Sequence, residues 1–328
     1  MQATPHHPTD APVAPFTAWY GFPAGEARCD SVQAFSPSTL VLREYEMVHP
    51  GGDLTERIPV CVFLIKHAQT GRYALFDLGL WQDWSKTIPA DKQANYEAFE
   101  VQVDEDLDKV MEKKGVKAED VEVIIISHNH FDHCGTLRGF ERFPSARVIV
   151  GPDSRSKIPA LHDHKNVNEL SWHHSPTRIA AFEHSYDVWN DGSLVVVATP
   201  GHTTGHIAAL VRTTAPSATP ASEGEYLLLA GDCCHSGLLL HPTPAQAHLR
   251  IGRWRNPGEP LTEPPAHSMH EDLLQAEFSF ERVKAAERKD EVMVVLAHDK
   301  RRWELWGGSG IALNGLELAE WRKKGLKV

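Results

Sequence analysis

Short aliphatic runs between polar and glycine-rich stretches are the main pattern along this chain. The clearest run is residues 121–126, in which Glu122 is the one polar residue. β-Branched residues in such a short apolar run favour a strand that is buried on both faces. We predict further strands at 38–48, 146–150 and 194–198, and a hairpin of 58–67 and 72–78 around the turn Gln69-Thr70-Gly71.

Two segments have the spacing of an amphipathic helix. In residues 101–114 the apolar side chains recur every three or four positions, and Gly115 ends the segment. In residues 271–288, Leu274, Phe278 and Val283 fall on one helical face. We expect the second helix to pack on an outer layer of the fold, just before a last strand.

Polar, proline-rich segments separate these elements. Residues 1–15 are predicted to be a disordered arm, and residues 16–328 a single domain with loop insertions. One insertion is expected near 213–225, which is rich in Ala, Pro, Ser and Thr, and a long cap-like loop near 236–268. Residues 81–95 have no clean period and predict a loop or short helix.

Composition limits the classes of partner. Hydrophobic residues make up 41% of the 328 positions and charged residues 23%, as in a globular enzyme, and the formal net charge is −11. Because no Lys/Arg-rich run supplies a basic face, we expect no nucleic acid or anionic membrane as a partner. No apolar stretch reaches the roughly 18 residues of a spanning helix, and the polar start lacks the apolar core of a signal peptide, so we predict a cytoplasmic protein.

The five cysteines are scattered and predict reduced thiols, not a disulfide framework. Cys233 and Cys234 are expected to be small packing residues, since strand alternation points Cys233 away from the side of its neighbour Asp232.

Four potential metal ligands follow the strand at 121–126 within six positions. They are His128, His130, Asp132 and His133. In an extended segment His128 and His130 point the same way. Imidazole nitrogen and carboxylate oxygen bind zinc-like ions at about 2.0–2.2 Å and must be held rigidly, as a loop fixed to a strand end can do. The spacing indicates a metal site with one pair of ligands for each of two ions.

The pattern H-x-H-x-D-H after an apolar strand resembles the signature of the metallo-β-lactamase superfamily. The resemblance implies an α/β fold, a four-layer αβ/βα sandwich, with a centre of two metal ions. The segment T-P-G-H-T-T-G-H at 199–206 resembles the second motif of that family, with His202 in the ligand position. The run before Asp232 resembles the strand that presents a bridging carboxylate, and the run before His298 resembles the last strand. The resemblance covers roughly residues 40 to 300.

The same resemblance implies how the ligands divide. His128, His130 and His202 are expected to hold one ion, Asp132, His133 and His298 the other, and Asp232 to bridge them. The expected cofactor is two divalent ions, with zinc first, although such ligands also accept Fe, Mn or Co. Five neutral imidazoles and two carboxylates neutralise half the charge of two dications, so a bridging water would be largely hydroxide at neutral pH. That hydroxide is the predicted nucleophile, and Asp132 the predicted proton carrier.

Within the superfamily the sequence is most similar to the N-acyl homoserine lactonases, the quorum-quenching lactonases. Those enzymes commonly place a Tyr three residues after the bridging Asp, and here that position is His235. We predict that His235 is catalytic and donates a hydrogen bond to the substrate carbonyl. Asp77, in a D-x-G turn after the hairpin, is either a partner to a ligand His or a turn former.

The predicted reaction is therefore the opening of a lactone, a small-molecule substrate. The oligomeric state is left open by the sequence, with a homodimer as the commonest choice. A lactamase, or a cyclic-carbamate hydrolase acting on a small bicyclic substrate, is an alternative, because His235 departs from the lactonase pattern. A glyoxalase II-like thioesterase shares the metal ligands, but the residues after His298 are too few for the C-terminal helical domain of such enzymes. A non-catalytic scaffold is disfavoured by the complete ligand set.

Overall fold

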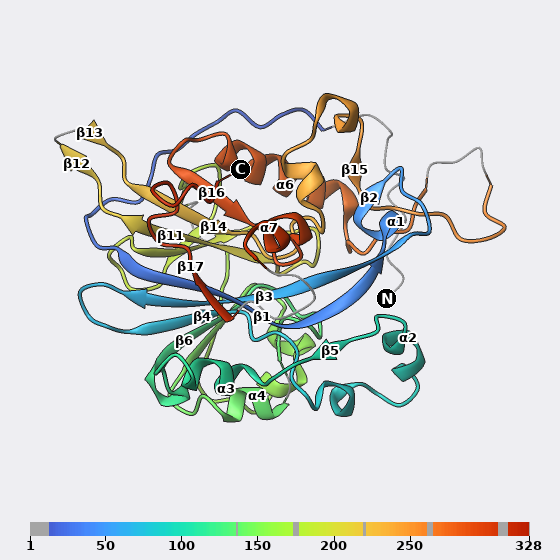
Figure 1. Ribbon diagram of the computed structural model, residues 1–328, viewed down its shortest axis with the longest axis horizontal. Coiled ribbons are helices and arrows are strands. Elements are labelled where there is room, and N and C mark those ends of the chain that lie inside the picture. The colour runs from blue at the N-terminus through green and yellow to red at the C-terminus, as the bar shows by residue number, and fades with distance from the viewer. Residues whose placement is uncertain are drawn as a thin grey trace.

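Two β-sheets form the centre of the computed structural model, which describes residues 13–135, 137–172, 177–218, 221–260, 265–307 and 314–327 (Figure 1). The larger sheet has the strand order β17-β1-β3-β4-β6-β7-β8, with β5 also paired to β1, and the second has the order β16-β14-β11-β10-β9. The larger sheet consists of β1 (Cys29–Arg43), β3 (Thr55–His67), β4 (Tyr73–Phe76), β5 (Gln102–Val103), β6 (Val121–Ile126), β7 (Arg147–Val150), β8 (Val167–Glu169) and β17 (Asn314–Glu317). The second consists of β9 (Ser185–Asp187), β10 (Leu194–Ala198), β11 (Ile207–Thr214), β14 (Glu225–Leu229) and β16 (Val292–Val295).

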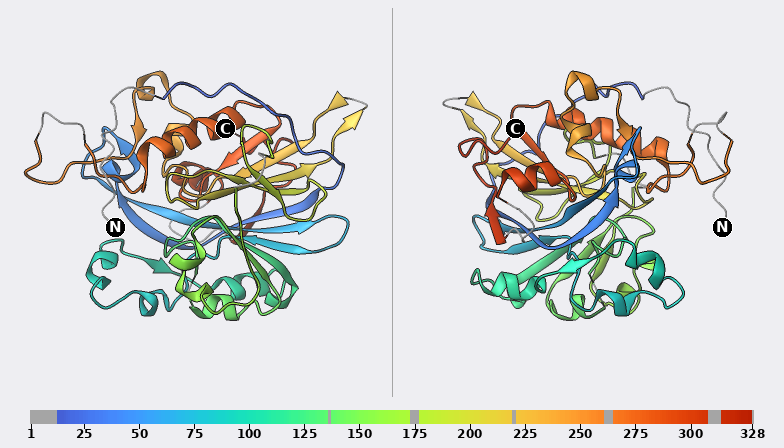
Figure 2. Two further views of the ribbon diagram at one scale, coloured as in Figure 1. Left: turned by 180° about the vertical axis from the view of Figure 1, so that it is seen from behind. Right: turned by 45° about the vertical axis from the view of Figure 1, so that its right-hand side comes forward.

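Helices cover the outer faces of both sheets (Figures 1 and 2). The helices α3 and α4 lie against the larger sheet, and α6 lies against the second, so the layers are helix, sheet, sheet and helix. The α-helices are α1 (Glu44–Met47), α2 (Gln93–Glu97), α3 (Leu107–Glu112), α4 (Leu137–Glu141), α5 (Gly237–Leu240), α6 (Leu273–Glu287) and α7 (Lys300–Leu305). Short 3-10 helices occur at η1 (Trp84–Thr87), η2 (Ala118–Asp120), η3 (Arg155–Lys157), η4 (Pro159–Leu161) and η5 (Pro244–Gln246). The predicted four-layer αβ/βα sandwich is confirmed.

The strand β6 explains why its sequence is apolar at nearly every position. Val123 and Ile125 belong to the core between the two sheets, whereas Ile124 and Ile126 pack in the outer core under α3 and α4. Both of its neighbours, β4 and β7, are parallel to it. A strand covered on both faces has no polar side, and this is why parallel strands read as continuous hydrophobic runs.

The first strand is longer than predicted. The chain enters β1 at Cys29, not at Ser38, and residues 44–47 are helical instead of extended. The pairing of β1 with β3 shifts between Phe35 and Ser38, so Pro37 lies at an irregularity of the ladder. A proline is tolerated at such a bulge because its missing N–H is not needed for pairing.

The two predicted helices differ in outcome. The helix expected at 101–114 is shortened to α3, because Val103 lies in β5 and pairs with Ser38 of β1. The helix expected at 271–288 is present as α6. Its predicted buried face is wrong in part, since Leu274 and Phe278 are 43% and 47% exposed, and Ala276 and Phe280 are buried instead.

The expected loop insertions contain regular structure. Within 213–225 the strands β12 (Ser217–Ala218) and β13 (Ala221–Ser222) pair, and they extend the β11–β14 hairpin away from the body (Figures 1 and 2). The 236–268 segment contains α5, η5 and β15 (Arg250–Ile251), which pairs with β2 (Val48–His49). Residues 1–12 of the predicted arm lie outside the described residues. The division into an arm and a single domain stays a prediction.

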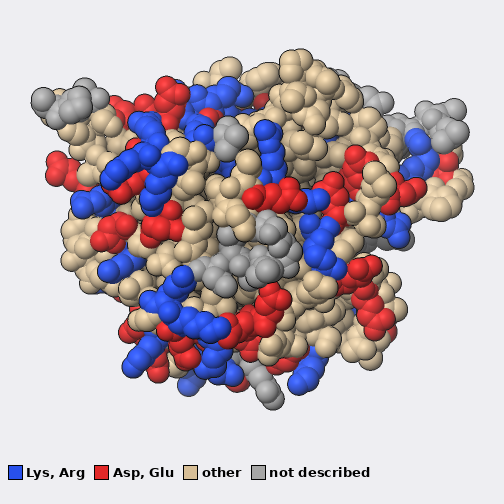
Figure 3. Space-filling model, viewed as in Figure 1, with Lys and Arg blue, Asp and Glu red and all other residues tan. Residues whose placement is uncertain are grey.

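No helix of the described residues is long and apolar enough to cross a membrane. Acidic and basic side chains are intermixed over the face of the molecule that Figure 3 shows.

Candidate metal centre

Strand ends on both sheets bring the predicted ligands together. His128, His130, Asp132 and His133 lie in the loop after β6, at the edge where the parallel strand β4 also ends. The second sheet contributes His202 from the β10–β11 turn, Asp232 after β14 and His298 after β16, and the last two strands are parallel. Parallel strands deliver the residues that follow them to one edge of a sheet, and this explains why positions so far apart in sequence meet.

The first group of side chains converges on His202. Its Nε2 atom lies 2.9 Å from Nδ1 of His130, 3.1 Å from Nε2 of His128 and 3.4 Å from Oδ2 of Asp232. Ligand atoms of these four residues all lie within 4.8 Å of one another, which is close enough for one cation. This is the group that the sequence predicts for the first ion.

The second group is Asp132, His133 and His298. The Nε2 atom of His298 is 3.3 Å from Oδ2 of Asp132 and 3.4 Å from Nε2 of His133. Asp232 reaches this group as well, since its Oδ2 is 3.3 Å from Nε2 of His298 and its Oδ1 is 3.3 Å from Nε2 of His133. The Asp232 carboxylate therefore lies between the two groups, where a bridging ligand is expected.

The electrostatics of the cluster follow from burial and close charges. Burial opposes ionisation of Asp232, but the imidazoles of His133 and His298 outweigh it and hold the carboxyl pKa well below its ordinary value. Burial opposes protonation of His298 too, but Asp232 and Asp132 raise its pKa to about 10. For His202, burial and the adjacent His128 and His130 lower the pKa well below its ordinary value.

These side chains fit divalent metal ions. In the first group, Nε2 of His202 lies at hydrogen-bond distance from two other imidazole nitrogens, and at most one of these contacts can be a well-directed N–H···N hydrogen bond. At the other contact two lone pairs face each other, and a cation between the nitrogens would remove that repulsion. Nitrogen and carboxylate oxygen are the ligands that zinc, iron, manganese and cobalt accept.

A buried aspartate orients one of the predicted ligands. Oδ2 of Asp77 lies 2.8 Å from Nδ1 of His133, and the same carboxylate accepts hydrogen bonds from the Ser127 backbone N–H at 2.7 Å and from the Ser127 hydroxyl at 2.8 Å. Asp77 also has a positive φ of 62°, so it forms a tight turn as well. Both alternatives that the sequence left open are therefore present at this one residue. His298 is oriented in a similar way, because the peptide carbonyl of Pro59 lies 2.7 Å from its Nδ1 atom, as Asp77 does for His133.

The structure adds two histidines to the cluster. His206, the last residue of the T-P-G-H-T-T-G-H segment, accepts a hydrogen bond at Nε2 from the backbone N–H of Asp232, 3.1 Å away, and its Nδ1 is 2.8 Å from the Thr199 hydroxyl. A side chain at Gly231 would place its Cβ 2.9 Å from His206 Nε2, so this glycine permits the approach. His206 thus fixes the backbone that presents Asp232.

His270 is the second addition, and it lies against His235. The ring centroids of these two residues are 5.2 Å apart, and that of His270 is 4.8 Å from that of His202. His235 is close to the predicted bridge, with Nε2 3.2 Å from Oδ2 of Asp232. No sequence signal points to His270, because it follows a proline-rich segment and belongs to no motif.

A cavity of about 240 Å³ opens beside the cluster. Apolar and aromatic side chains form most of its wall, and polar atoms of the cluster form the remainder. The lining residues are Leu40, Leu42, Tyr96, Phe99, Phe131 and Met269, with His130, Asp132, Asp232, His235 and His298. A site of this volume, apolar but with a few converging polar groups, suits a small organic molecule.

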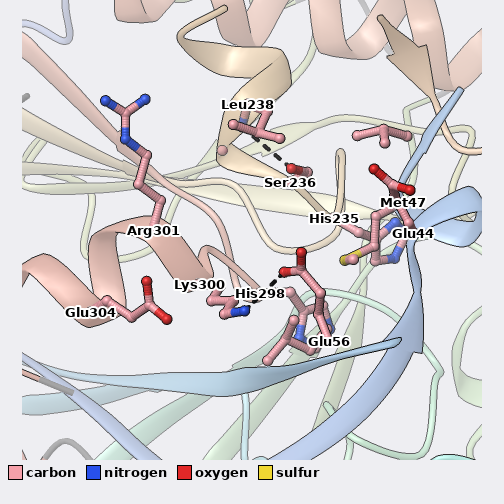
Figure 4. A pocket seen from close by; sticks show the side chains of 13 residues that line it. Glu44, Met47, Glu56, His235, Ser236, Leu238, His298, Lys300, Arg301 and Glu304 are labelled. Atoms are coloured by element: carbon pink, nitrogen blue, oxygen red, sulfur yellow. Dashed lines mark hydrogen bonds and ion pairs between the residues drawn. The ribbon is translucent and has the colours of Figure 1, made fainter. Parts of the chain in front are cut away.

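A second cavity, of about 250 Å³, shares His235 and His298 with the first (Figure 4). Its lining includes the charged side chains Glu44, Glu56 and Lys300, of which Glu56 and Lys300 form an ion pair at 3.2 Å. The apolar cavity and the charged cavity therefore approach the same two histidines.

Comparison with known proteins identifies relatives of this chain. Residues 55–210 match the model of the metallo-β-lactamase superfamily. A gamma-lactamase of Gibberella moniliformis, MBL2, is 29% identical over 248 residues, which cover 64% of this chain and 99% of that protein. A cytochrome P450 monooxygenase of Penicillium brevicompactum, mpaDE', is 30% identical over 272 residues, and the match covers 76% of this chain but 30% of that protein.

Solved structures share the fold. A quorum-quenching N-acyl homoserine lactone lactonase superposes with a TM-score of 0.58 at 16% sequence identity, covering 84% of this chain and 95% of that one. The expected similarity in fold to the lactonases is thus confirmed, while in sequence a protein named for a lactam matches over 99% of its own length.

Proposed function

We propose that the chain is a member of the metallo-β-lactamase superfamily, as the match of residues 55–210 to its model indicates, and that it is a metal-dependent hydrolase that opens a small ring at a cyclic ester or cyclic amide bond. The observation that carries this proposal is the apolar cavity whose polar side consists of His130, Asp132, Asp232, His235 and His298. A small ring can bury its hydrocarbon against the apolar wall and present its carbonyl to the polar side.

Two divalent ions held by the seven predicted ligands would polarise the carbonyl and supply an activated water. Asp132 lines the cavity, and its Oδ2 is 3.3 Å from His298. A carboxylate at that place can take the proton of the attacking water and deliver it to the ring heteroatom as the ring bond breaks. Every atom is then accounted for, since water adds across the C–O or C–N bond and leaves a carboxylate beside an alcohol or amine.

His235 is the second residue that can reach the substrate. It lines the cavity and lies against the predicted bridging carboxylate. An imidazole N–H can donate a hydrogen bond to the substrate carbonyl, and it can also protonate a leaving group. The aromatic wall, made by Tyr96, Phe99 and Phe131, excludes water from the ring and selects for apolar substituents.

A lactone is the substrate that the sequence motifs favour, and a γ-lactam is the second candidate. Two observations favour the lactam. A gamma-lactamase is 29% identical to this chain over nearly the whole length of that enzyme. His235 also stands where lactonases commonly carry Tyr, and an amine leaving group needs protonation more than an alkoxide does. Thioester hydrolysis has weaker support, since a hydroxyacylglutathione hydrolase of Pseudomonas entomophila is 33% identical over 137 residues, which cover 40% of this chain.

A rate panel on metal-loaded protein tests the proposal. The panel contains γ-lactones with short and long acyl chains, a bicyclic γ-lactam, a cyclic carbamate, a thioester and a β-lactam. We expect turnover of the lactones or of the γ-lactam at least 100-fold above the thioester, and loss of that turnover in a chelator. Comparable rates on the linear thioester, or turnover that chelation leaves intact, contradict the proposal.

A further inference from the structure

A third group of imidazoles lies beside the predicted metal centre. His202, His235 and His270 each offer a ring nitrogen, and these atoms lie within 4.8 Å of one another. All three side chains are buried, with exposed fractions of 1%, 1% and 6%. We call this set the imidazole triad. Nothing in the sequence motifs requires it, because His270 belongs to none of them.

Most nitrogens of the triad lack partners. Both ring nitrogens of His270, Nδ1 of His235 and Nδ1 of His202 make no hydrogen bond within the part of the chain that the structure describes, whereas Nε2 of His235 faces the Asp232 carboxylate. Each such buried group is costly if it stays unsatisfied. Several orphaned nitrogens that face one another indicate a missing polar occupant, since packing alone does not explain why imidazoles and not apolar rings stand here.

The scaffold holds the triad in place before any occupant arrives. The backbone N–H groups of Glu271 and Asp272 donate to the carbonyls of His202 and Gly201, each at 2.9 Å. Gly201 is packed so closely on α6 that a Cβ there would lie 2.1 Å from the backbone nitrogen of Ala276. The segment that carries His270 is therefore bound to the turn that carries His202, and neither can move far without the other.

The chemistry of three imidazoles favours a borderline transition-metal cation. Imidazole nitrogen binds such an ion at about 2.0–2.1 Å, so two nitrogens on one ion stand at most about 4 Å apart. The triad nitrogens lie within 4.8 Å of one another, so the rings must turn toward each other before all three bind one ion. Three protein ligands leave one position of a tetrahedral ion open. An open position suits a site that exchanges its ion, whereas a structural site is closed by four ligands.

We propose that the imidazole triad is an alternative seat for one divalent cation, used in loading the metal centre. The seat shares His202 with the first group of predicted ligands, so it rests on the proposed function. Two cations this close to each other would repel strongly, and His202 turns Nε2 toward His128 and His130. An ion therefore occupies either the seat or the first group, and rotation of His202 passes it from one to the other.

Zinc counting in variants tests the seat without any substrate. The full-length protein is stripped with a chelator, dialysed against a fixed free Zn²⁺ concentration and analysed by mass spectrometry for metal content. The wild type is expected to hold two equivalents. The double variant His128→Ala/His130→Ala removes the first group but leaves the triad, so it still holds two. Adding His270→Ala to that background lowers the content to one.

The matched control is His248→Ala in the same double background, since His248 is an exposed histidine on the 236–268 segment, and it is expected to keep two equivalents. A triple variant with His270→Ala that also keeps two equivalents overturns the seat. The seat is also overturned if the double variant His128→Ala/His130→Ala binds only one equivalent of Zn²⁺ while its thermal unfolding shows that it is folded.

Uptake kinetics in the otherwise intact protein provide a second measurement if the double variant does not fold. His270→Ala is expected to slow Zn²⁺ loading at least fivefold while the final content stays at two equivalents. Loading at the wild-type rate means that water alone occupies the triad, and overturns the proposal. If no substrate of the panel is turned over but the zinc content still depends on His270, the hydrolase proposal is contradicted and the seat is not.

Discussion

Asp77→Asn is the most informative single change at the second group of predicted ligands. Asn is nearly isosteric with Asp and is one of the few residues that adopt positive φ readily, so the backbone at φ 62° is kept. The carbonyl oxygen of Asn can still accept from the Ser127 N–H, now 2.7 Å from Oδ1. The substitution replaces Oδ2 with an NH₂ group, which cannot accept from Nδ1–H of His133.

The expected loss is the buried, charge-assisted hydrogen bond to His133, worth about 1.5–3 kcal/mol. The Ser127 hydroxyl, which donates to the same oxygen at 2.8 Å, has to turn and accept from the new NH₂ group. Since Asp77 is 1% exposed, solvent does not compensate for the lost bond. At about 1.4 kcal/mol for each factor of ten, the affinity for the ion on the His133 side should fall roughly 10- to 100-fold. The affinity for the ion on the His202 side should change little, because Asp77 does not contact that group.

Competition against a chromophoric chelator measures both affinities. Saturating metal should restore most of the hydrolytic rate of the variant, because the ligands themselves are unchanged. Asp191→Asn is the matched control, since Asp191 forms a carboxylate–imidazole pair with His67 at 2.8 Å outside the cluster. Two wild-type affinities in Asp77→Asn, or an equal loss in Asp191→Asn, refute the reasoning.

Three further predictions follow from the cluster. Asp132→Asn should lose turnover by about 100-fold or more on the best substrate of the panel, and wild-type rates would exclude Asp132 as the proton carrier. Gly231→Ala should lower metal content and activity together, because its Cβ meets His206 at 2.9 Å and φ is +52°; unchanged metal content contradicts the role of His206 in placing Asp232. Loading at pH 8 should release protons, since the pKa of His298 is raised to about 10 in the metal-free protein against an ordinary 6.5. The ion pairs of protonated His298 therefore stabilise the metal-free fold fully below about pH 6.5, and this stabilisation is lost as the pH rises toward 10. The affinity of His298 for metal rises over the same pH range, because only the deprotonated ring can bind the ion. Calorimetry in buffers of different ionisation enthalpy counts the protons, and none released contradicts the charged state of His298.

The ligands that could be predicted from sequence are those that lie in short, recognisable motifs. H-x-H-x-D-H follows a strand whose apolar character is unmistakable, so the sequence alone predicts where the loop after β6 lies. It does not predict the place of His270, because that position depends on backbone hydrogen bonds between residues 271–272 and 201–202. The residues next to His270 in the sequence give no sign of these long-range hydrogen bonds.

Errors in the fold have similar causes. Ser36-Pro37-Ser38 has the composition of a strand breaker, yet β1 continues through it as an irregularity in the ladder with β3. The predicted face of α6 is wrong in part: Val283 is buried as expected, but the helix turns Ala276 inward because this residue packs closely on Gly201. Tertiary contacts, which no local window contains, decide both cases.

The predicted ligands come from both sheets, with His133 on the larger one and His202, Asp232 and His298 on the second. Ions bound there would join the two halves of the sandwich, so their binding energy would add to the free energy of unfolding. An ion present at 100 times its dissociation constant contributes about 2.7 kcal/mol. Metal starvation should therefore make this protein sensitive to heat and proteases as well as inactive, and its abundance in a cell would follow the supply of metal.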